Sequence, residues 1–300
     1  MSIVLTTPTG HIGSALLRRL LDAGQDAVTV LVRDASKLPD GVRGRVEVRE
    51  GVLQDAAFVR AATEGADALF WLSPNDWTVP VLDDWYTALA ASVAGAVDAN
   101  GIGHIVHLSS EGAQNRTDFG PVSGLGRIEA ALDATGAAVR HLRPTFFQEN
   151  FEAQLGGIVG AGAVFFPVPE TTTTGMVATR DIAERAAALL TDRSWTGRGV
   201  VPLYGPEDLS YADAARILSV GLGREVRVQT VPPEALVAQF TSMGASADFA
   251  DGLVRLYTRI GTDGYSADPR TPDSTTPTPL SAYVADTLRP AFDAMTAAQG

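Results

Sequence analysis

The sequence predicts an α/β protein with a doubly wound, mostly parallel sheet and a smaller C-terminal α/β lobe. Three observations support this fold class. Short β-branched runs alternate with longer amphipathic segments through the first half, as in parallel strands joined by crossover helices. The 300 residues, 45% of them hydrophobic, are enough to bury a large core. A loop containing two glycines separates the first apolar run from the first helical segment.

The first half contains the segments expected to form the sheet. Strands are expected over residues 3–5, 27–32, 46–48, 68–72, 104–108 and 138–142, and helices over 12–22, 56–62, 85–100 and 125–135. Right-handed crossovers would place these strands in one parallel sheet. We therefore expect residues 1–150 to form one domain.

The second half is less regular and is expected to form the smaller lobe over residues 151–300. Helices are expected over 146–161, 179–191, 211–222, 233–243, 249–260 and 280–295, and strands over 162–169, 199–203 and 224–231. Ser210 is the expected N-cap of the helix that follows it. Residues 171–174 are expected to form a loop, and residues 261–278 a polar, turn-rich segment. The two halves are expected to share one compact body, with a cleft over the carboxyl ends of the strands.

Composition excludes several classes of function. A formal net charge of −12 disfavours binding to nucleic acid or to an anionic membrane. The absence of cysteine excludes disulfides and thiolate chemistry, and the four histidines lack metal-ligand spacing, so no metal site is expected. Without a leader or a long apolar run, the chain is expected to be cytoplasmic, as a monomer or homodimer. Lys37 is the only lysine, so any lysine-dependent mechanism must use it.

The loop after the first strand has the context of a dinucleotide-binding loop, between a strand and a helix. Gly10 would let the backbone approach a phosphate, Gly13 would let the helix pack on the strand, and the helix N-terminus would bind a pyrophosphate. Thr7 stands where the full motif has its first glycine, so the site could be weak or empty. The alternative is an ordinary turn without a ligand. The expected cofactor-binding residues of this loop are Thr7, Thr9, Gly10, His11, Ile12 and Gly13.

The end of the second strand bears on the choice of cofactor. A basic residue there accommodates the 2′-phosphate of NADP, whereas an acidic residue bonds the 2′-hydroxyl of NAD. Arg33 and Lys37 favour NADP, and Asp34 keeps NAD possible. The alternative is a solvated turn of mixed charge.

The ends of the fourth and fifth strands carry the remaining polar candidates. Leu72 and Ser73 are expected to lie along the cofactor. The hydroxyl of Ser109 or Ser110 could polarise a substrate carbonyl, although two serines at a strand end are also a routine turn.

Aromatic side chains could form an apolar wall for a small-molecule substrate. The candidates are Trp77, Trp85, Tyr86, Phe146, Phe147 and Phe151. Of these six, the two tryptophans and the tyrosine could instead cover the edge of the sheet.

Taken together, these segments resemble the NmrA-like branch of the atypical short-chain dehydrogenases over nearly the whole chain. The family's motifs stand here in order: G-A-T-G-x-x-G at residues 7–13, V-R-D/N-x-x-K at 32–37, L-S-S at 108–110, L-R-P-x-x-F-x-x-N-F at 142–151, R-D-I-A at 180–183 and G-P-E-x-L-S-Y at 205–211. The resemblance implies a Rossmann-like fold, NAD(P) across the strand ends and a substrate lobe from the second half. Family members include quinone reductases, other reductases and redox-sensing regulators.

One departure from the wider group bears on mechanism. Many short-chain dehydrogenases use a Tyr-x-x-x-Lys pair, in which lysine lowers the pKa of the tyrosine. The corresponding residues 120–129 contain neither tyrosine nor lysine. A quinone tolerates this loss because its two-electron product is a stabilised phenolate, whereas reduction of a plain ketone is harder to explain.

Two functions from different classes follow. The first is an NAD(P)H-dependent reductase that passes hydride to a quinone-like or conjugated carbonyl acceptor. The second keeps the fold without redox chemistry, as a cofactor-sensing regulator or as a cyclase or isomerase of a small hydrophobic metabolite. Acid–base work would then fall to one of Asp76, Asp83, Asp84, Glu111 or His141. A binding module without any chemistry is a third alternative.

Overall fold

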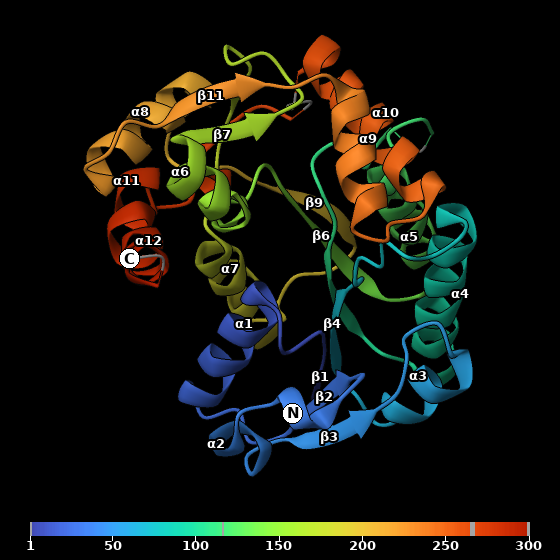
Figure 1. Cartoon of the computed structure of the whole chain (residues 1–300). Coiled ribbons are helices and arrows are strands. Elements are labelled where there is room, and N and C mark those ends of the chain that lie inside the picture. Colours follow the sequence, from blue (N-terminus) through green and yellow to red (C-terminus); the bar gives the residue numbers. More distant parts are fainter. Residues whose placement is uncertain (1, 116, 265–267, 299–300) are drawn as a thin grey trace.

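The centre of the molecule is a seven-stranded parallel sheet (Figure 1). The computed structural model describes residues 2–115, 117–264 and 268–298. In spatial order the strands are β3 (Glu47–Glu50), β2 (Val28–Val32), β1 (Ile3–Thr6), β4 (Ala68–Leu72), β5 (His104–Leu108), β6 (Ala138–Pro144) and β9 (Arg198–Leu203). The order reverses between β1 and β4, which confirms the doubly wound sheet. In such sheets ligands bind at this reversal, outside the carboxyl ends of the strands.

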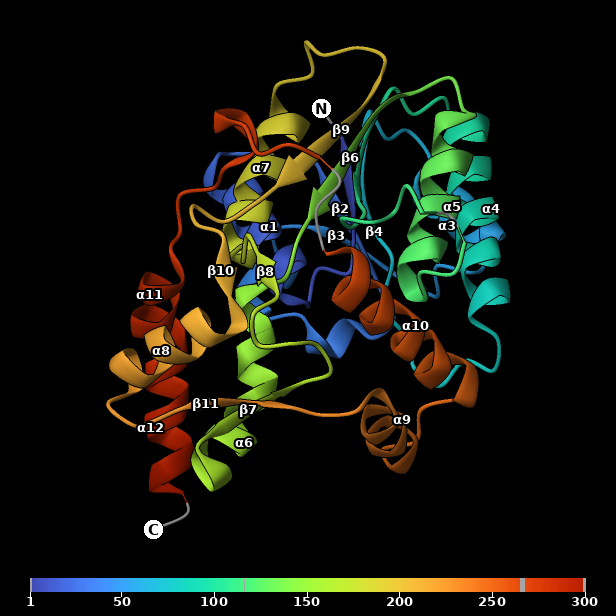
Figure 2. The same cartoon turned by 90° about the horizontal axis from the view of Figure 1, so that it is seen from above.

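Helices cover both faces of the sheet, as Figure 2 shows. One face carries α1 (His11–Asp22) and α7 (Thr179–Thr191), and the other carries α3 (Ala56–Ala62), α4 (Leu82–Asn100) and α5 (Pro121–Asp133). Because side chains alternate along a strand, Leu5 packs in the core beneath α1, whereas Val4 packs in the core beneath α4. Both α7 and β9 come from the second half of the chain, which therefore contributes one edge strand and one covering helix to the central sheet.

The C-terminal lobe is built around two small sheets. Strand β7 (Ala163–Phe166) pairs in parallel with β11 (Arg227–Thr230), and β8 (Thr173–Thr174) pairs antiparallel with β10 (Leu209–Ser210). The surrounding helices are α6 (Leu155–Ala161), α8 (Tyr211–Leu222), α11 (Leu280–Tyr283) and α12 (Arg289–Ala297), the last two joined by a π-helical turn at Val284–Leu288. Two further helices, α9 (Pro233–Ser242) and α10 (Ala247–Asp263), lie apart from these, toward α4 and α5 (Figure 1).

Several helix and strand bounds agree with the sequence. The segments α3, β4, β5 and α7 have the predicted limits, and Ser210 caps α8 in a reciprocal capping box with Asp213. Helices α4 and α5 begin earlier than predicted, at Leu82 and Pro121. Proline suits the first turn of a helix, because its missing N–H would have no partner there.

The predicted helix over residues 146–161 is wrong in its first half. Phe147 is extended and pairs with Val177. In the chain, Phe147 is followed by a 3-10 helix at Gln148–Gln154 and only then by α6. The amide of Gln148 donates to the carbonyl of Val177 at 2.9 Å, so the backbone here bonds across the fold instead of along a helix.

Other predicted bounds also change. The loop at 171–174 contains β8, and the polar segment at 261–278 begins inside α10, with residues 265–267 outside the described residues. The predicted single helix at 280–295 is interrupted by the π-helical turn. The short helices at Ala35–Lys37 and Asp40–Arg43 (α2) were not expected. Among the described helices, none has the length and apolar character needed to span a membrane.

Candidate functional site

A cavity of about 460 Å³ lies over the carboxyl ends of β1, β2 and β4, at the reversal of the strand order. It extends from the second strand to the segment that follows β6. Its walls are formed by Thr7, Pro8, Thr9, Gly10, His11, Ile12, Leu31, Val32, Arg33, Asp34, Lys37, Gly51, Leu53, Gln54, Leu72, Pro74, Trp85, Phe147, Glu149, Asn150, Ala153 and Thr179. The volume lies within the usual range of about 300–1,000 Å³ for small-molecule and cofactor sites.

The loop after β1 turns at Thr7, which has a φ of 52°. This left-handed conformation is rare for β-branched residues and explains why a glycine is usual at the position. The Thr7 hydroxyl donates to the carbonyl of Thr6 at 2.8 Å, and the Thr7 carbonyl accepts from the amide of Gly10 at 3.3 Å. Threonine therefore forms the same tight turn, and its side chain lines the cavity.

The two glycines of this loop have different structural roles. A Cβ on Gly13 would lie 2.0 Å from the carbonyl oxygen of Thr7, so α1 can approach the loop only with glycine there. A Cβ on Gly10 would meet nothing nearer than that oxygen at 3.8 Å, so the space above Gly10 is open to a ligand. No side chain of the residues that the structure describes caps the start of α1. The helix N-terminus is therefore available to an anion, and the loop fits a pyrophosphate.

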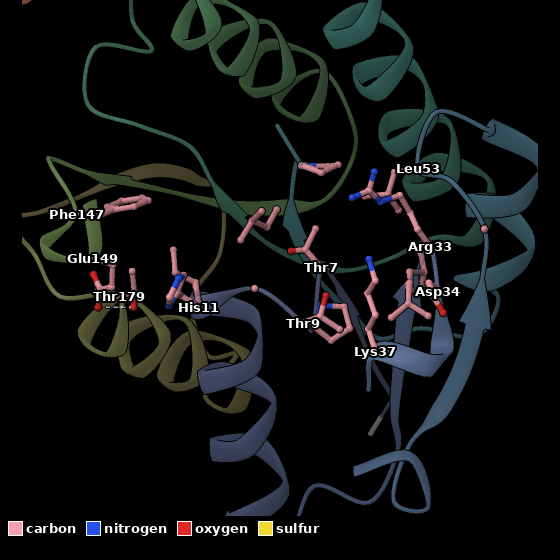
Figure 3. A pocket seen from close by; sticks show the side chains of 18 of the residues that line it. Thr7, Thr9, His11, Arg33, Asp34, Lys37, Leu53, Phe147, Glu149 and Thr179 are labelled. Carbon is pink, nitrogen blue, oxygen red and sulfur yellow. Dashed lines mark hydrogen bonds between the residues drawn. The ribbon is translucent and has the colours of Figure 1, made fainter. Parts of the chain in front are cut away.

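One end of the cavity is basic. The side chains of Arg33 and Lys37 extend into it (Figure 3), and neither makes an ion pair or hydrogen bond with any residue that the structure describes. The Asp34 carboxylate accepts from the hydroxyl of Ser36 at 2.6 Å and from its amide at 2.9 Å. These hydrogen bonds lower the pKa of Asp34. Asp34 is therefore bonded within its own turn, whereas both cations are free to bind an anionic ligand.

The opposite end carries the half-buried carboxyl group of Glu149 (Figure 3). The Glu149 carboxylate accepts from the Thr179 hydroxyl at 2.7 Å and from the Thr179 amide at 3.0 Å, at the start of α7. Burial raises the pKa of Glu149, and the bonds from Thr179 oppose that shift. Sequence reasoning missed Glu149, Asn150 and Thr179 as wall residues. The motif at residues 142–151 contains Glu149 and Asn150 beside the phenylalanines and could have indicated these two residues.

A second, smaller cavity of about 200 Å³ adjoins the first, and Phe147 and Asn150 line both. Its remaining walls come from Ser110, Glu111, Phe119, Val122, Pro144, Thr145, Phe146, Leu256, Tyr257 and Ile260. Of the two predicted serines, only Ser110 lines it. Ser109 is buried on the other side of the strand end, and its hydroxyl has no partner among the described residues.

Besides Gly13 and Ser109, four predicted site residues lie outside both cavities. Ser73 is buried and accepts from the indole N–H of Trp71 at 3.1 Å. Tyr86 is buried against α5, with its hydroxyl 3.3 Å from the Asn75 side chain. Phe151 is fully buried in the core of the lobe, and Trp77 packs on Phe240 at 6.0 Å between ring centroids. None of the four lines either cavity.

The candidates for acid–base work are also separated. His141 is buried on β6, where one ring nitrogen lies 3.1 Å from Asp133 and the other 3.1 Å from His107. Asp83 pairs with Arg127 on the exterior, and neither Asp76 nor Asp84 lines a cavity. Glu111 alone among them lines a cavity, and Tyr204 bonds its carboxylate at 3.3 Å. Within the described ranges, no group of three or more potential metal ligands occurs.

Comparison with known proteins agrees with the resemblance drawn from the sequence motifs. A family model described as NAD(P)H-binding matches residues 8–193. An NAD(P)H azoreductase of Xenophilus azovorans is 29% identical over 255 residues, covering 85% of this chain and 86% of the relative. Agroclavine dehydrogenase of Claviceps fusiformis is 30% identical over 210 residues, covering 66% of this chain and 67% of the relative.

Solved structures share the fold across nearly the whole chain. An NADPH-dependent quinone oxidoreductase of Escherichia coli, in complex with NADPH, has a TM-score of 0.79 at 21% identity, covering 95% of this chain and 99% of the other. The triphenylmethane reductase of Citrobacter sp. has a TM-score of 0.77 at 20% identity, covering 99% of this chain and 100% of the other.

Proposed function

We propose, from the premise that this chain belongs to the NAD(P)H-binding family, that it is an NADPH-dependent reductase of a quinone-like or conjugated carbonyl acceptor. The observation that carries the proposal is the continuous pair of cavities at the strand ends. The larger cavity has the glycine loop and two unpaired cations, and the smaller one is largely apolar. The names of the relatives, an azoreductase, a quinone oxidoreductase and a dye reductase, support the same class of reaction.

The choice of NADP over NAD rests on the basic end of the first cavity. Arg33 and Lys37 would hold a 2′-phosphate, whereas the carboxylate of Asp34, which also lines the cavity, already accepts two hydrogen bonds from Ser36. The start of α1, with Gly10, would hold the pyrophosphate. The nicotinamide would then reach Phe147 and Asn150, where the two cavities meet.

When bound, the dihydronicotinamide would supply a hydride, which is two electrons and one proton. The chain's own residues would bind the dinucleotide and orient it, and the aromatic wall of the second cavity would pack against the acceptor. Residues 120–129, which now form the start of α5, supply no tyrosine or lysine for proton transfer. An acceptor whose reduced form is a stabilised anion suits this arrangement, because it needs no strong acid from the protein.

Binding and turnover test the proposal together. Arg33→Ala and Lys37→Gln should each weaken NADPH about tenfold or more, because each loses a charge-assisted contact of about 1.5–3 kcal/mol. The affinity for NADH should hardly change. Arg18→Ala removes an exposed cation of α1 outside the cavity and is the matched control. Equal losses for NADPH and NADH would contradict the assignment of the phosphate site.

A second candidate is a regulator or non-redox enzyme that binds the cofactor without hydride transfer. One observation favours it: α5 offers no Tyr–Lys pair for proton transfer. The two candidates differ in one experiment. The reductase oxidises NADPH in the presence of a panel of quinones and enones, whereas the regulator is stabilised by NADPH and oxidises none of it.

A further inference from the structure

The wall that α10 contributes to the second cavity carries a tyrosine between apolar side chains. Leu256, Tyr257 and Ile260 line the cavity together, at a spacing that places them on one side of a helix. The ring of Tyr257 is partly buried among the apolar residues of the lobe. The tyrosine therefore belongs to the α10 wall of the second cavity, far in sequence from the usual Tyr–Lys position.

Helix α10 is fixed in place by contacts with α4 and α5. A Cβ on Gly120, at the start of α5, would lie 2.0 Å from the carbonyl oxygen of Gly252 in α10, so the two backbones touch. The Asp248 carboxylate accepts from the amide of Leu82, the first residue of α4, at 2.8 Å. Tyr257 is therefore positioned by the scaffold before any ligand enters.

The hydroxyl groups of this cavity differ in what they are bonded to. Ser110 donates to the carbonyl of Glu111 at 3.0 Å, and Thr145 donates to the carbonyl of Gly175. The Tyr257 hydroxyl makes no hydrogen bond with any described residue. Burial raises the pKa of Tyr257, so this hydroxyl keeps its proton at neutral pH and can donate it in a hydrogen bond.

We propose that Tyr257 donates a hydrogen bond to the oxygen of a neutral, planar acceptor of one or two rings held in the second cavity. The assignment rests on the proposed reductase function. The aromatic walls of Phe119, Phe146 and Phe147 suit a flat ring. The volume of about 200 Å³ is below the range for larger ligands, which limits the acceptor to one or two rings.

The electron and proton balance of the reaction assigns Tyr257 a positioning and charge-stabilising role. The hydride brings two electrons and one proton to a quinone, and negative charge then develops on the quinone oxygen. A donor already in place stabilises that charge without reorganisation. Water at the open side of the cavity supplies the second proton, so the hydroquinone forms and Tyr257 keeps its own proton.

The test compares Tyr257→Phe with wild type and with Tyr86→Phe, which removes a hydroxyl outside both cavities. Calorimetry measures 1,4-naphthoquinone binding to the NADP⁺-saturated protein, and NADPH oxidation measures turnover. Tyr257→Phe should weaken quinone binding about tenfold and lower kcat by roughly 100-fold. NADPH affinity and the melting temperature should match wild type, and Tyr86→Phe should keep both quinone affinity and kcat.

Each other outcome decides between the two proposals. If wild type turns over and Tyr257→Phe keeps its quinone affinity and kcat, Tyr257 is not the donor and the reductase function stands. If wild type binds the quinone, Tyr257→Phe loses that affinity and neither oxidises NADPH, the donor assignment stands and the reductase function fails. A loss of NADPH affinity or of melting temperature in Tyr257→Phe overturns the donor assignment in favour of a structural role. Wild type that does not bind the quinone refutes the acceptor site itself.

Discussion

Two glycine substitutions, three residues apart in the loop after β1, should have opposite effects on folding and on cofactor binding. In Gly13→Ala the new Cβ would lie 2.0 Å from the Thr7 oxygen, 2.8 Å from the Thr7 carbonyl carbon and 3.1 Å from the Cα of Pro8. All three atoms are backbone, so the loop or α1 must move. Overpacking of this kind costs about 1–3 kcal/mol. In Gly10→Ala the nearest atom would be 3.8 Å away, so the ligand-free protein should fold with unchanged stability.

The melting temperature and the NADPH dissociation constant separate these effects. Gly13→Ala should lose about 2–4 °C for each kcal/mol. Gly10→Ala should keep its melting temperature and bind NADPH at least about tenfold more weakly, because the added methyl occupies the place of a phosphate. Gly95→Ala, where a Cβ would meet nothing within 4 Å, is the control for the substitution itself and should be slightly stabilising. A wild-type melting temperature for Gly13→Ala, or wild-type NADPH affinity for Gly10→Ala, would refute the reasoning.

Two further predictions concern buried charge beneath α5. Glu129→Ala leaves the largely buried guanidinium of Arg143 without its carboxylate partner, and should cost about 3 kcal/mol or more in chemical denaturation; a loss below 1 kcal/mol would show that Gln114 and Asp268 hold Arg143 unaided. The pKa of His107 is lowered by burial and then by His141 and Arg143, so the unfolded chain takes up this proton first as the pH falls. Stability should therefore drop below about pH 6.5, by up to about 1.4 kcal/mol per pH unit, and His107→Asn should reduce this slope between pH 5 and 7; an unchanged slope would assign the acid sensitivity to other groups.

The sheet could be predicted because its signals are local. A buried parallel strand reads as a short β-branched run, and the side chain of Asp55 caps α3 through two backbone amides, so the start of that helix is visible in the sequence. The prediction of a helix directly after β6 was wrong because the structure there depends on a distant contact. Phe146, Phe147 and Phe151 have a helix-like spacing, but the backbone at Phe147 pairs with Val177, thirty residues away, and no local pattern reports that pairing.

The sequence predicted which strand ends carry the candidate site, but it could not predict which side chains at those ends line a cavity. Ser109 and Ser110 are neighbours at one strand end, yet Ser110 lines the second cavity whereas the hydroxyl of Ser109 is buried without a partner among the described residues. Trp85 and Tyr86 are likewise adjacent on α4, where successive side chains point about 100° apart; Trp85 lines the first cavity and Tyr86 enters the core. Tyr257 could not be inferred, because the position of α10 against α4 and α5 is set by tertiary contacts.

The two ends of the first cavity differ in charge, and this difference makes the site directional. Arg33 and Lys37 stand at one end, and the Glu149 carboxyl stands at the other. A dinucleotide that entered the wrong way round would bring its phosphate against Glu149 and leave both cations without a counter-charge. For the proposed dinucleotide, these charges would favour the orientation that places a phosphate beside Arg33 and Lys37.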